Sequence, residues 1–329
     1  MIGIGLYIVF FLTVVSIYAI IVMGLNLQWG YTGLFNAGVV GFFAIGAYGT
    51  AVLSGPDNAR LIGGFELPYL FGVIGGILLA ALAGLIVALA TLKLREEYLA
   101  IATFGVSISI QLVALNFSSL TGGANGLVGL PRPFRDLFTE TSVYNVFFLC
   151  MVLVVAAVVY VALERAVRSP WGRVLRAIRE DVTAARSLGK NPTMIRLQSF
   201  VLGSAIMGLA GGLYVGFIGY VSPIDFLPIL TFQIWAMLIV GGSGNNRGAV
   251  LGCLIVWGLW TASGYVISNL VPPVFQSRAG SLQAMLIGTV IVLTLLFRPR
   301  GLIGEEDVIS AHAAETGSAG QTEGAIEKG

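Results

Sequence analysis

The sequence predicts an all-α integral membrane protein: a polytopic helical bundle of about 8–10 spans with one amphipathic helix on its cytoplasmic side. The first observation is composition, because 57% of the residues are apolar and only 10% are charged. The mean hydropathy is +0.92, whereas a soluble domain is roughly 25% charged. The second is a series of apolar runs, several reaching the ~20 residues that cross a bilayer. The third is a cluster of arginines confined to residues 168–189.

Nine apolar runs are candidate spans, with boundaries at about 2–25, 34–54, 69–92, 98–117, 143–163, 197–220, 229–242, 248–269 and 282–297. The seventh is too short for a full crossing, which favours a half-helix. The first has no basic residues before its apolar run and no small-residue cleavage site, so we interpret it as a retained helix.

Positive charge divides unevenly between the two sides of such a bundle. With the N-terminus outside, thirteen lysines and arginines fall in inner loops and four in outer loops. The inner set is Lys93, Arg95, Arg165, Arg168, Arg173, Arg176, Arg179, Arg186, Lys190, Arg196, Arg247, Arg298 and Arg300, and the outer set is Arg60, Arg132, Arg135 and Arg278. An excess of Lys and Arg marks the cytoplasmic side, so the arginine-rich segment is predicted to be cytoplasmic.

Residues 1–303 are predicted to form one membrane domain and residues 304–329 a disordered cytoplasmic tail. The tail is rich in Glu, Ala, Gly, Ser and Thr and has too few large apolar residues to order itself. It holds the only histidine, His312, and we expect the two cysteines, Cys150 and Cys253, to be buried membrane thiols. With no paired carboxylates either, the sequence predicts no catalytic residue and no metal site.

Small residues recur every four positions in three stretches, which predicts close packing of helix backbones. They are Gly208, Gly212 and Gly216; Gly244, Gly248 and Gly252; and Ala80, Gly84 and Ala88.

Three other stretches are unusually polar or glycine-rich: GLNLQWGYTGLFNAG (24–38), TGGANGLVG (121–129) and GGSGNNRG (241–248). Irregular backbone at membrane depth persists only where it is buried in protein or lines a wet cavity. For 24–38, a pathway segment and an ordinary loop are both open.

The arginine-rich segment predicts a single amphipathic helix from Pro170 to Leu188. Ser169 is a suitable N-cap and Pro170 a suitable first residue, while Gly189 followed by Pro192 predicts the end. One face carries Trp171, Val174, Leu175, Ile178, Val182 and Ala185, and another carries Arg173, Arg176 and Glu180. The pattern is compatible with a helix lying on anionic lipid and with one docking into a groove of a cytosolic partner.

The sequence shows no motif that would supply energy for transport. None of its three lysines, Lys93, Lys190 and Lys328, lies in a phosphate-binding G-x-x-x-x-G-K-[ST] loop. The predicted spans are almost free of the ionisable residues that a proton-coupled carrier uses. An active transporter of this kind needs a partner that hydrolyses ATP, which favours the docking interpretation.

Four segments resemble the LivM-type permeases of branched-chain amino acid ABC importers. They are GLNLQWGYTGLFNAGVVGFFAIGAYGTAVL, EEYLAIATFGVSISIQLVALN, TGGANGLVGLP and RSPWGRVLRAIREDVTAARSLGKNPTMIRLQSFV, and the closing FRPRGLIG also matches. The resemblance extends from about residue 20 to 303, in order and with similar spacing.

The resemblance implies a permease subunit in a bacterial inner (plasma) membrane that binds no cofactor itself and relies on ATP used by other subunits. The implied partners are a LivH-type sister permease, two cytoplasmic ATPase subunits, a periplasmic substrate-binding protein and membrane lipid, with no nucleic acid. Segment 168–189 then corresponds to the coupling loop, whose pattern resembles E-A-A-x-x-x-G. Ala184, Ala185 and Gly189 match this pattern, and Thr183 replaces its Glu.

Two sets of functional residues follow. The set predicted to couple to the ATPase is Trp171, Arg173, Leu175, Arg176, Ile178, Glu180, Asp181, Ala184, Ala185 and Gly189. Trp171, Leu175 and Ile178 would anchor the helix, and the arginines would meet the partner. The set predicted for the substrate path is Asn26, Thr32, Asn36, Thr121 and Asn125, which are uncharged polar residues beside glycines near proposed breaks.

Other functions remain as alternatives. A urea or short-chain amide ABC importer would have a similar membrane subunit, and a stand-alone secondary carrier or a membrane-embedded enzyme are less favoured because the spans lack charged and catalytic groups.

Overall fold

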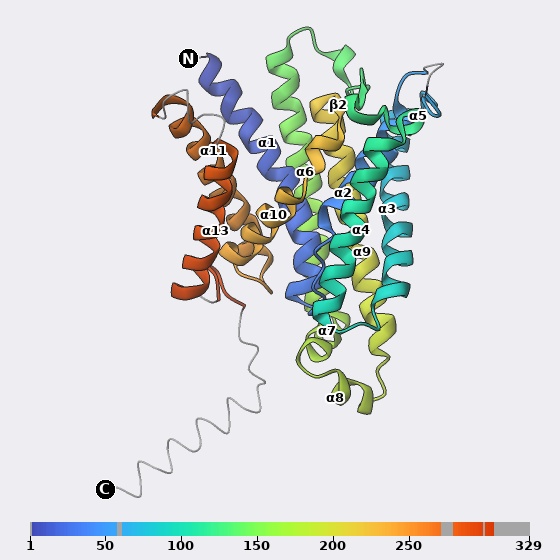
Figure 1. Ribbon diagram of the computed structural model, residues 1–329, viewed down its shortest axis with the longest axis vertical. Helices are drawn as coiled ribbons and strands as arrows, with labels where there is room; N and C mark the ends of the chain where they lie inside the picture. The colour runs from blue at the N-terminus through green and yellow to red at the C-terminus, as the bar shows by residue number, and fades with distance from the viewer. Residues whose placement is uncertain (1, 58–60, 271–278, 299, 306–329) are drawn as a thin grey trace, which may run out of the picture.

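The computed structural model describes residues 2–57, 61–270, 279–298 and 300–305. Each predicted span corresponds to a helix (Figure 1). Seven are long enough to cross a membrane, namely α1 (Ile2–Leu25, continued to Gly30), α3 (Tyr69–Thr91), α4 (Glu96–Asn116), α6 (Thr141–Arg168), α9 (Pro192–Ile218), α11 (Asn246–Leu270) and α13 (Ala279–Phe297). Two shorter apolar helices complete the set: α2 (Val39–Ser54) and α10 (Pro228–Gly241). The fold class and the short seventh span are therefore confirmed.

Helices α2, α3 and α9 pack closely at the centre of the bundle, and small residues make this possible. A Cβ atom added to Gly46 of α2 would meet the backbone of Gly208 in α9, and one added to Gly208 would meet Cβ of Ala80 in α3. Further along α3, a Cβ on Gly84 would lie 2.7 Å from Cβ of Ser204. The predicted small-residue stretches of α3 and α9 thus form the helix contacts themselves.

The segment between α1 and α2 is irregular and buried. Helix α1 continues into a π-helical turn, η1 (Asn26–Gly30), and residues 33–38 then run as non-helical chain to α2. The predicted second span begins five residues too early for this reason. Segment 24–38 is therefore a broken helix inside the bundle rather than an ordinary loop at its surface, and neighbouring helices satisfy its polar groups. Its role as a pathway segment stays a prediction.

One end of the bundle carries the N-terminus and short elements (Figure 1). These are α5 (Ser118–Thr121), η2 (Gly123–Asn125), β1 (Leu127–Val128), η3 (Arg135–Leu137), β2 (Tyr220–Val221) and η4 (Pro223–Phe226). Strands β1 and β2 pair antiparallel. The opposite end carries α7 (Pro170–Glu180) and α8 (Val182–Ser187), so loops predicted to lie on opposite sides of the membrane do lie at opposite ends of the protein.

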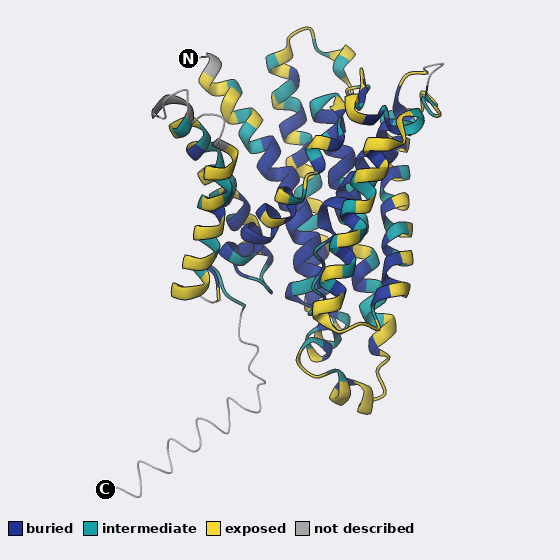
Figure 2. Ribbon diagram, in the orientation of Figure 1, coloured by how far each residue is buried: buried dark blue, intermediate teal, exposed yellow. Residues whose placement is uncertain are grey.

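Burial decreases from the centre to the periphery (Figure 2). The outer faces of α3 and α6 expose large apolar side chains such as Leu78 and Val158, as lipid contact requires. Cys253 is buried in the protein, whereas Cys150 lies on the exposed face of α6, where lipid rather than protein would cover it.

The last described residues pack against the bundle. The amides of Leu302 and Ile303 donate to the carbonyls of Val240 and Gly241 at the end of α10, at 2.9 and 3.0 Å. Gly304, the first residue of the predicted tail, accepts a hydrogen bond from Asn245 at 3.1 Å. Residues 306–329 lie outside the described residues, so the predicted disorder of the tail stays a prediction.

Candidate functional site

A tight corner joins α6 to α7. The Ser169 hydroxyl accepts from the Trp171 amide at 3.2 Å, and Pro170 occupies the first helical position, so the predicted start is confirmed. A Cβ on Gly172 would meet the Val167 carbonyl. The absence of a side chain at Gly172 therefore lets α7 fold back against the end of α6, a requirement that the sequence analysis did not identify.

The predicted single helix from Pro170 to Leu188 is wrong. Asp181 has an extended backbone (φ −148°, ψ 107°) and separates α7 from α8. Its carboxylate accepts from the amides of Thr183 and Ala184 at 2.7 and 3.0 Å. Asp is among the strongest N-caps because its side chain replaces the bonds that a helix start lacks. The result is two short helices broken at Asp181, α7 and α8, at the end of the bundle, which we call the α7–α8 hairpin.

The apolar face of the hairpin packs on its own chain. Leu175 and Ile178 are fully buried, and Ala185 is nearly so. The half-buried Trp171 donates through Nε1 to Gln198 of α9 at 3.0 Å. These side chains fix the hairpin to the bundle, and its opposite face is exposed.

The exposed tip of the hairpin comprises the junction between α7 and α8 and the residues around the end of α8. Glu180, Asp181, Ala184 and Gly189 are exposed, and Leu188 has 78% of its surface exposed. Gly189 has φ +74°, a conformation that favours glycine, and it ends the hairpin where the sequence predicts.

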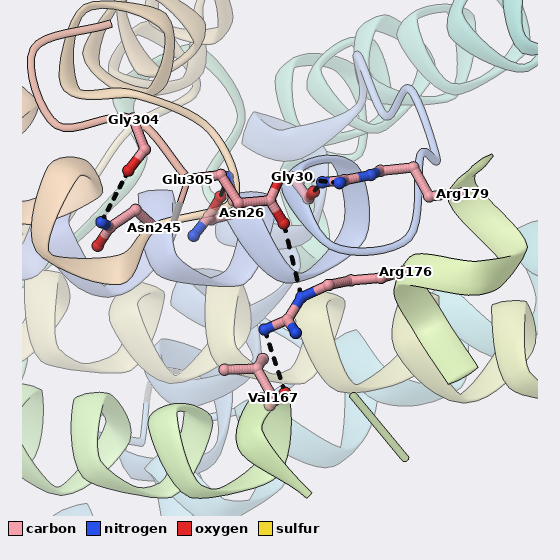
Figure 3. A network of polar contacts seen from close by, with 9 residues as sticks. Asn26, Gly30, Val167, Arg176, Arg179, Asn245, Gly304 and Glu305 are labelled. Carbon is pink, nitrogen blue, oxygen red and sulfur yellow. Dashed lines mark hydrogen bonds and ion pairs between the residues drawn. The ribbon is translucent and has the colours of Figure 1, made fainter. Parts of the chain in front are cut away.

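Two arginines of α7 point into the protein. Arg179 donates to the carbonyl of Gly30, at the end of η1, and to Glu305 at 2.8 Å. The Nε atom of Arg176 lies 3.5 Å from the other carboxylate oxygen of Glu305. Figure 3 shows both side chains reaching from α7 toward Glu305 and Gly30. Of the three α7 arginines expected at a partner surface, only Arg173 is exposed.

Glu305 is a site residue that the sequence analysis missed, because it was assigned to the tail. Its partners are 129 and 126 positions away in sequence (305 − 176 and 305 − 179), and no local pattern reveals such a distant pair. The only local feature that could have drawn attention to Glu305 is its position as an acidic residue directly after FRPRGLIG.

A buried polar network holds the irregular segment next to these arginines. The Asn26 side chain donates to Asn246 at 3.0 Å and accepts from the Gly244 amide at 2.9 Å. Asn36 donates to Gln28 at 2.8 Å, and Gln28 donates to the Phe200 carbonyl at 2.8 Å. All of these side chains are buried, and their partners come from η1, α9 and the start of α11.

The five residues predicted for the substrate path fall into two groups. Asn26, Thr32 and Asn36 come together in the buried network, where the Thr32 hydroxyl lies 2.7 Å from that of Ser199. Thr121 and Asn125 lie toward the opposite end; Thr121 is buried, and Asn125 lines a cavity of about 520 Å³ formed by residues within 51–57, 61–64 and 118–130. The path assignment remains a prediction for all five.

Hydrogen bonds join the α7–α8 hairpin to the buried polar network. Arg179 connects α7 to Gly30, the last residue of the π-helical turn whose first residue is Asn26. Asn246 in turn donates to Glu164 near the end of α6 at 3.1 Å. The hairpin is therefore hydrogen-bonded directly to the broken helix. These features define the class of protein: a multi-pass helical membrane protein with a discontinuous helix of the kind that transporters contain.

A model of the family described as branched-chain amino acid transport system / permease component matches residues 7–295. This match covers most of the chain, which therefore belongs to that permease family and is a transport permease rather than an enzyme.

Similar proteins include two kinds of permease. The LivM permease of Salmonella typhimurium strain LT2 is 30% identical over 312 residues, covering 88% of this chain and 68% of the relative. A probable LivM of Methanocaldococcus jannaschii is 29% identical over 325 residues, covering 90% and 92%. The LivH permease of Salmonella typhimurium is 28% identical over 312 residues, covering 90% and 94%. No solved structure matches the chain.

Proposed function

We propose that this chain is the LivM-type permease subunit of an ATP-driven importer of branched-chain amino acids. The names of its LivM and LivH relatives support this substrate class. The observation that carries the proposal is the α7–α8 hairpin, which exposes its tip and is bonded internally to the broken helix through Arg179.

The proposed assembly has four kinds of protein. A LivH-type permease pairs with this chain in a bacterial inner membrane, two ATPase subunits bind on the cytoplasmic face, and a periplasmic binding protein delivers the amino acid. This chain binds no cofactor, and ATP is used by the ATPase subunits. The similarity of this chain to both LivM and LivH relatives supports a pair of related permeases.

The hairpin is the proposed docking element for an ATPase. Its buried residues Leu175 and Ile178 attach it to the bundle rather than to the partner, so the partner contacts fall to exposed residues such as Glu180, Ala184 and Leu188. Closure of the ATPase dimer would shift the hairpin as a unit, because its apolar face is already packed.

Arg179 would transmit this shift to the broken helix. Moving the Gly30 carbonyl strains the π-helical turn and the Asn26 hydrogen bonds to Asn246 and Gly244. Rearrangement of this buried network would convert the path between two states, one open to each side. Its uncharged amide and hydroxyl groups suit a passage that must release its cargo.

Uptake by a reconstituted transporter tests this function. Proteoliposomes would contain this chain, the sister permease and ATPases encoded beside it, and the adjacent binding protein. Labelled leucine, isoleucine, valine and urea would be supplied with and without ATP. The proposal predicts ATP-dependent uptake of the three amino acids. Uptake of urea alone would replace the substrate class, and uptake by this chain without ATP or partners would indicate a secondary carrier.

A further inference from the structure

The exposed face of α6 changes from apolar to basic where the helix reaches the cytoplasmic end. Val154, Val158 and Val161 are exposed and are followed on the same helical face by Arg165 and Arg168, which are also exposed. This order matches that of a phospholipid lying beside the helix, since the apolar residues face the acyl chains and the basic residues lie at the level of the charged headgroup.

A cavity of about 220 Å³ lies beside this basic end. It is formed by α6, α7 and the turn before α11, and its lining includes Tyr31, Glu164, Arg168, Arg173, Arg176 and Glu305. A shallow hollow along α6, lined by Tyr160, Val161, Glu164, Arg165 and Arg168, shares two of these residues. The cavity and the lipid-facing side of α6 are therefore continuous.

The charge around the cavity is unbalanced. Five arginines, at positions 165, 168, 173, 176 and 247, stand against two carboxylates, Glu164 and Glu305. Both carboxylates already have partners, since Glu164 bonds to Arg168 at 2.7 Å and Glu305 to Arg179 at 2.8 Å. Among the described residues, Arg165 and Arg173 have no acidic partner. The site therefore attracts an anion.

We propose that this cavity binds the phosphate headgroup of an anionic phospholipid whose acyl chains lie along the valines of α6. Arginine guanidinium groups bind phosphate oxygens through paired hydrogen bonds, and basic pockets at the ends of membrane helices bind acidic headgroups. Arg165 and Arg168 hold the phosphate at the membrane surface. Arg173 and Arg176 carry the contact to α7, so the lipid joins the bilayer to the hairpin.

This inference needs only the membrane location and not the transport activity. It is tested on the purified chain in detergent by native mass spectrometry with dioleoylphosphatidylglycerol. Parallel samples contain dioleoylphosphatidylcholine or glycerol 3-phosphate. The variants are the double change Arg165→Gln with Arg168→Gln, the charge-conserving Arg165→Lys with Arg168→Lys, and Lys93→Gln as a control in another loop at the same end.

The proposal predicts that wild type, the lysine double variant and Lys93→Gln bind phosphatidylglycerol, while the glutamine double variant binds it about 30-fold more weakly. This change corresponds to about 2 kcal/mol, or about 1 kcal/mol for each arginine near an anionic lipid. The lysine variant keeps the charge but not the paired hydrogen bonds, so it should bind more weakly than wild type and more tightly than the glutamine variant, which separates loss of charge from loss of folding.

Three results would overturn it: equal phosphatidylglycerol binding by the glutamine variant and wild type, equal binding of phosphatidylcholine, or equal affinity for glycerol 3-phosphate. The last result would identify a soluble phosphate ligand, because the acyl chains would then contribute nothing.

Discussion

The ion pair between Arg179 and Glu305 should stabilise the attachment of the α7–α8 hairpin measurably. The side chains are 25% and 31% exposed, and the two atoms lie 2.8 Å apart. Exposed ion pairs contribute about 0.2–1 kcal/mol, and hydrogen bonds to charged groups about 1.5–3 kcal/mol. A mostly buried pair lies between these ranges, so we expect about 1.5 kcal/mol for this interaction.

A double-mutant cycle separates this term from the others. Glu305→Gln should lower the free energy of unfolding by about 1.5 kcal/mol. Arg179→Gln should lower it by about 3 kcal/mol, because it also removes the bond to the Gly30 carbonyl. The double variant should lose about as much as Arg179→Gln alone.

The assay is unfolding in mixed micelles with a rising fraction of dodecyl sulfate, followed by circular dichroism. Arg186→Gln is the control, since Arg186 is an exposed arginine of α8, and it should change the free energy of unfolding by less than about 0.5 kcal/mol. A coupling energy below about 0.3 kcal/mol, or equal losses in Arg179→Gln and Arg186→Gln, would refute the reasoning.

Three further changes give distinct results. Gly208→Val places atoms against Ala80 and should destabilise the chain in the same assay by about 3 kcal/mol or more. Gly105→Val, where an added Cβ meets nothing within 4 Å, should be close to neutral. Similar losses of stability in both variants would contradict the packing account. Gly189→Val should lower uptake while membrane insertion stays normal, and Gly189→Asn, which tolerates the positive φ better, should retain more uptake; unchanged uptake in the valine variant would disprove a role for this turn. Burial raises the pKa of Asp225 overall, although hydrogen bonds from the Ser222 amide and the Tyr214 hydroxyl act in the opposite direction. The folded protein therefore binds this proton more tightly than the unfolded chain does, and the group adds stability as the pH falls from 7 toward 4. Asp225→Asn should reduce this pH dependence of the melting temperature, and an unchanged slope of melting temperature against pH would contradict the reasoning.

The spans could be predicted from sequence because a bilayer selects for long apolar helices, and hydropathy alone locates them. Close helix packing at the small residues of α3 and α9 could also be predicted, since few residues other than glycine and alanine allow helices to approach so closely, but the pairing of these two helices could not. The start of α7 followed from Ser169 and Pro170, whose side chains define a helix start locally.

The break at Asp181 could not be predicted because the apolar periodicity continues across it. Val182 and Ala185 remain in phase with Leu175 and Ile178, so the pattern favours one helix. The break forms because the Asp181 carboxylate accepts hydrogen bonds from two amides and caps α8. In the sequence, such a capping aspartate cannot be told from an aspartate on the exposed face of a continuous helix.

The direction of the arginines could not be predicted either. The amphipathic pattern separates an apolar from a polar face, but it does not show that Arg176 and Arg179 turn toward Glu305. Their partner, Glu305, is the last of the described residues, and pairs so distant in sequence depend on the complete fold.

Photo-crosslinking tests most directly whether the hairpin is the docking element of the ATPase. A photoreactive amino acid at position 188, where Leu188 is 78% exposed, is compared with one at position 137, where Leu137 is 74% exposed at the opposite end. In membranes containing the complete transporter, position 188 should crosslink to an ATPase subunit and position 137 should not. Crosslinking to the ATPase from position 137, or its absence at position 188 in a transporter that shows ATP-dependent uptake, would contradict the account.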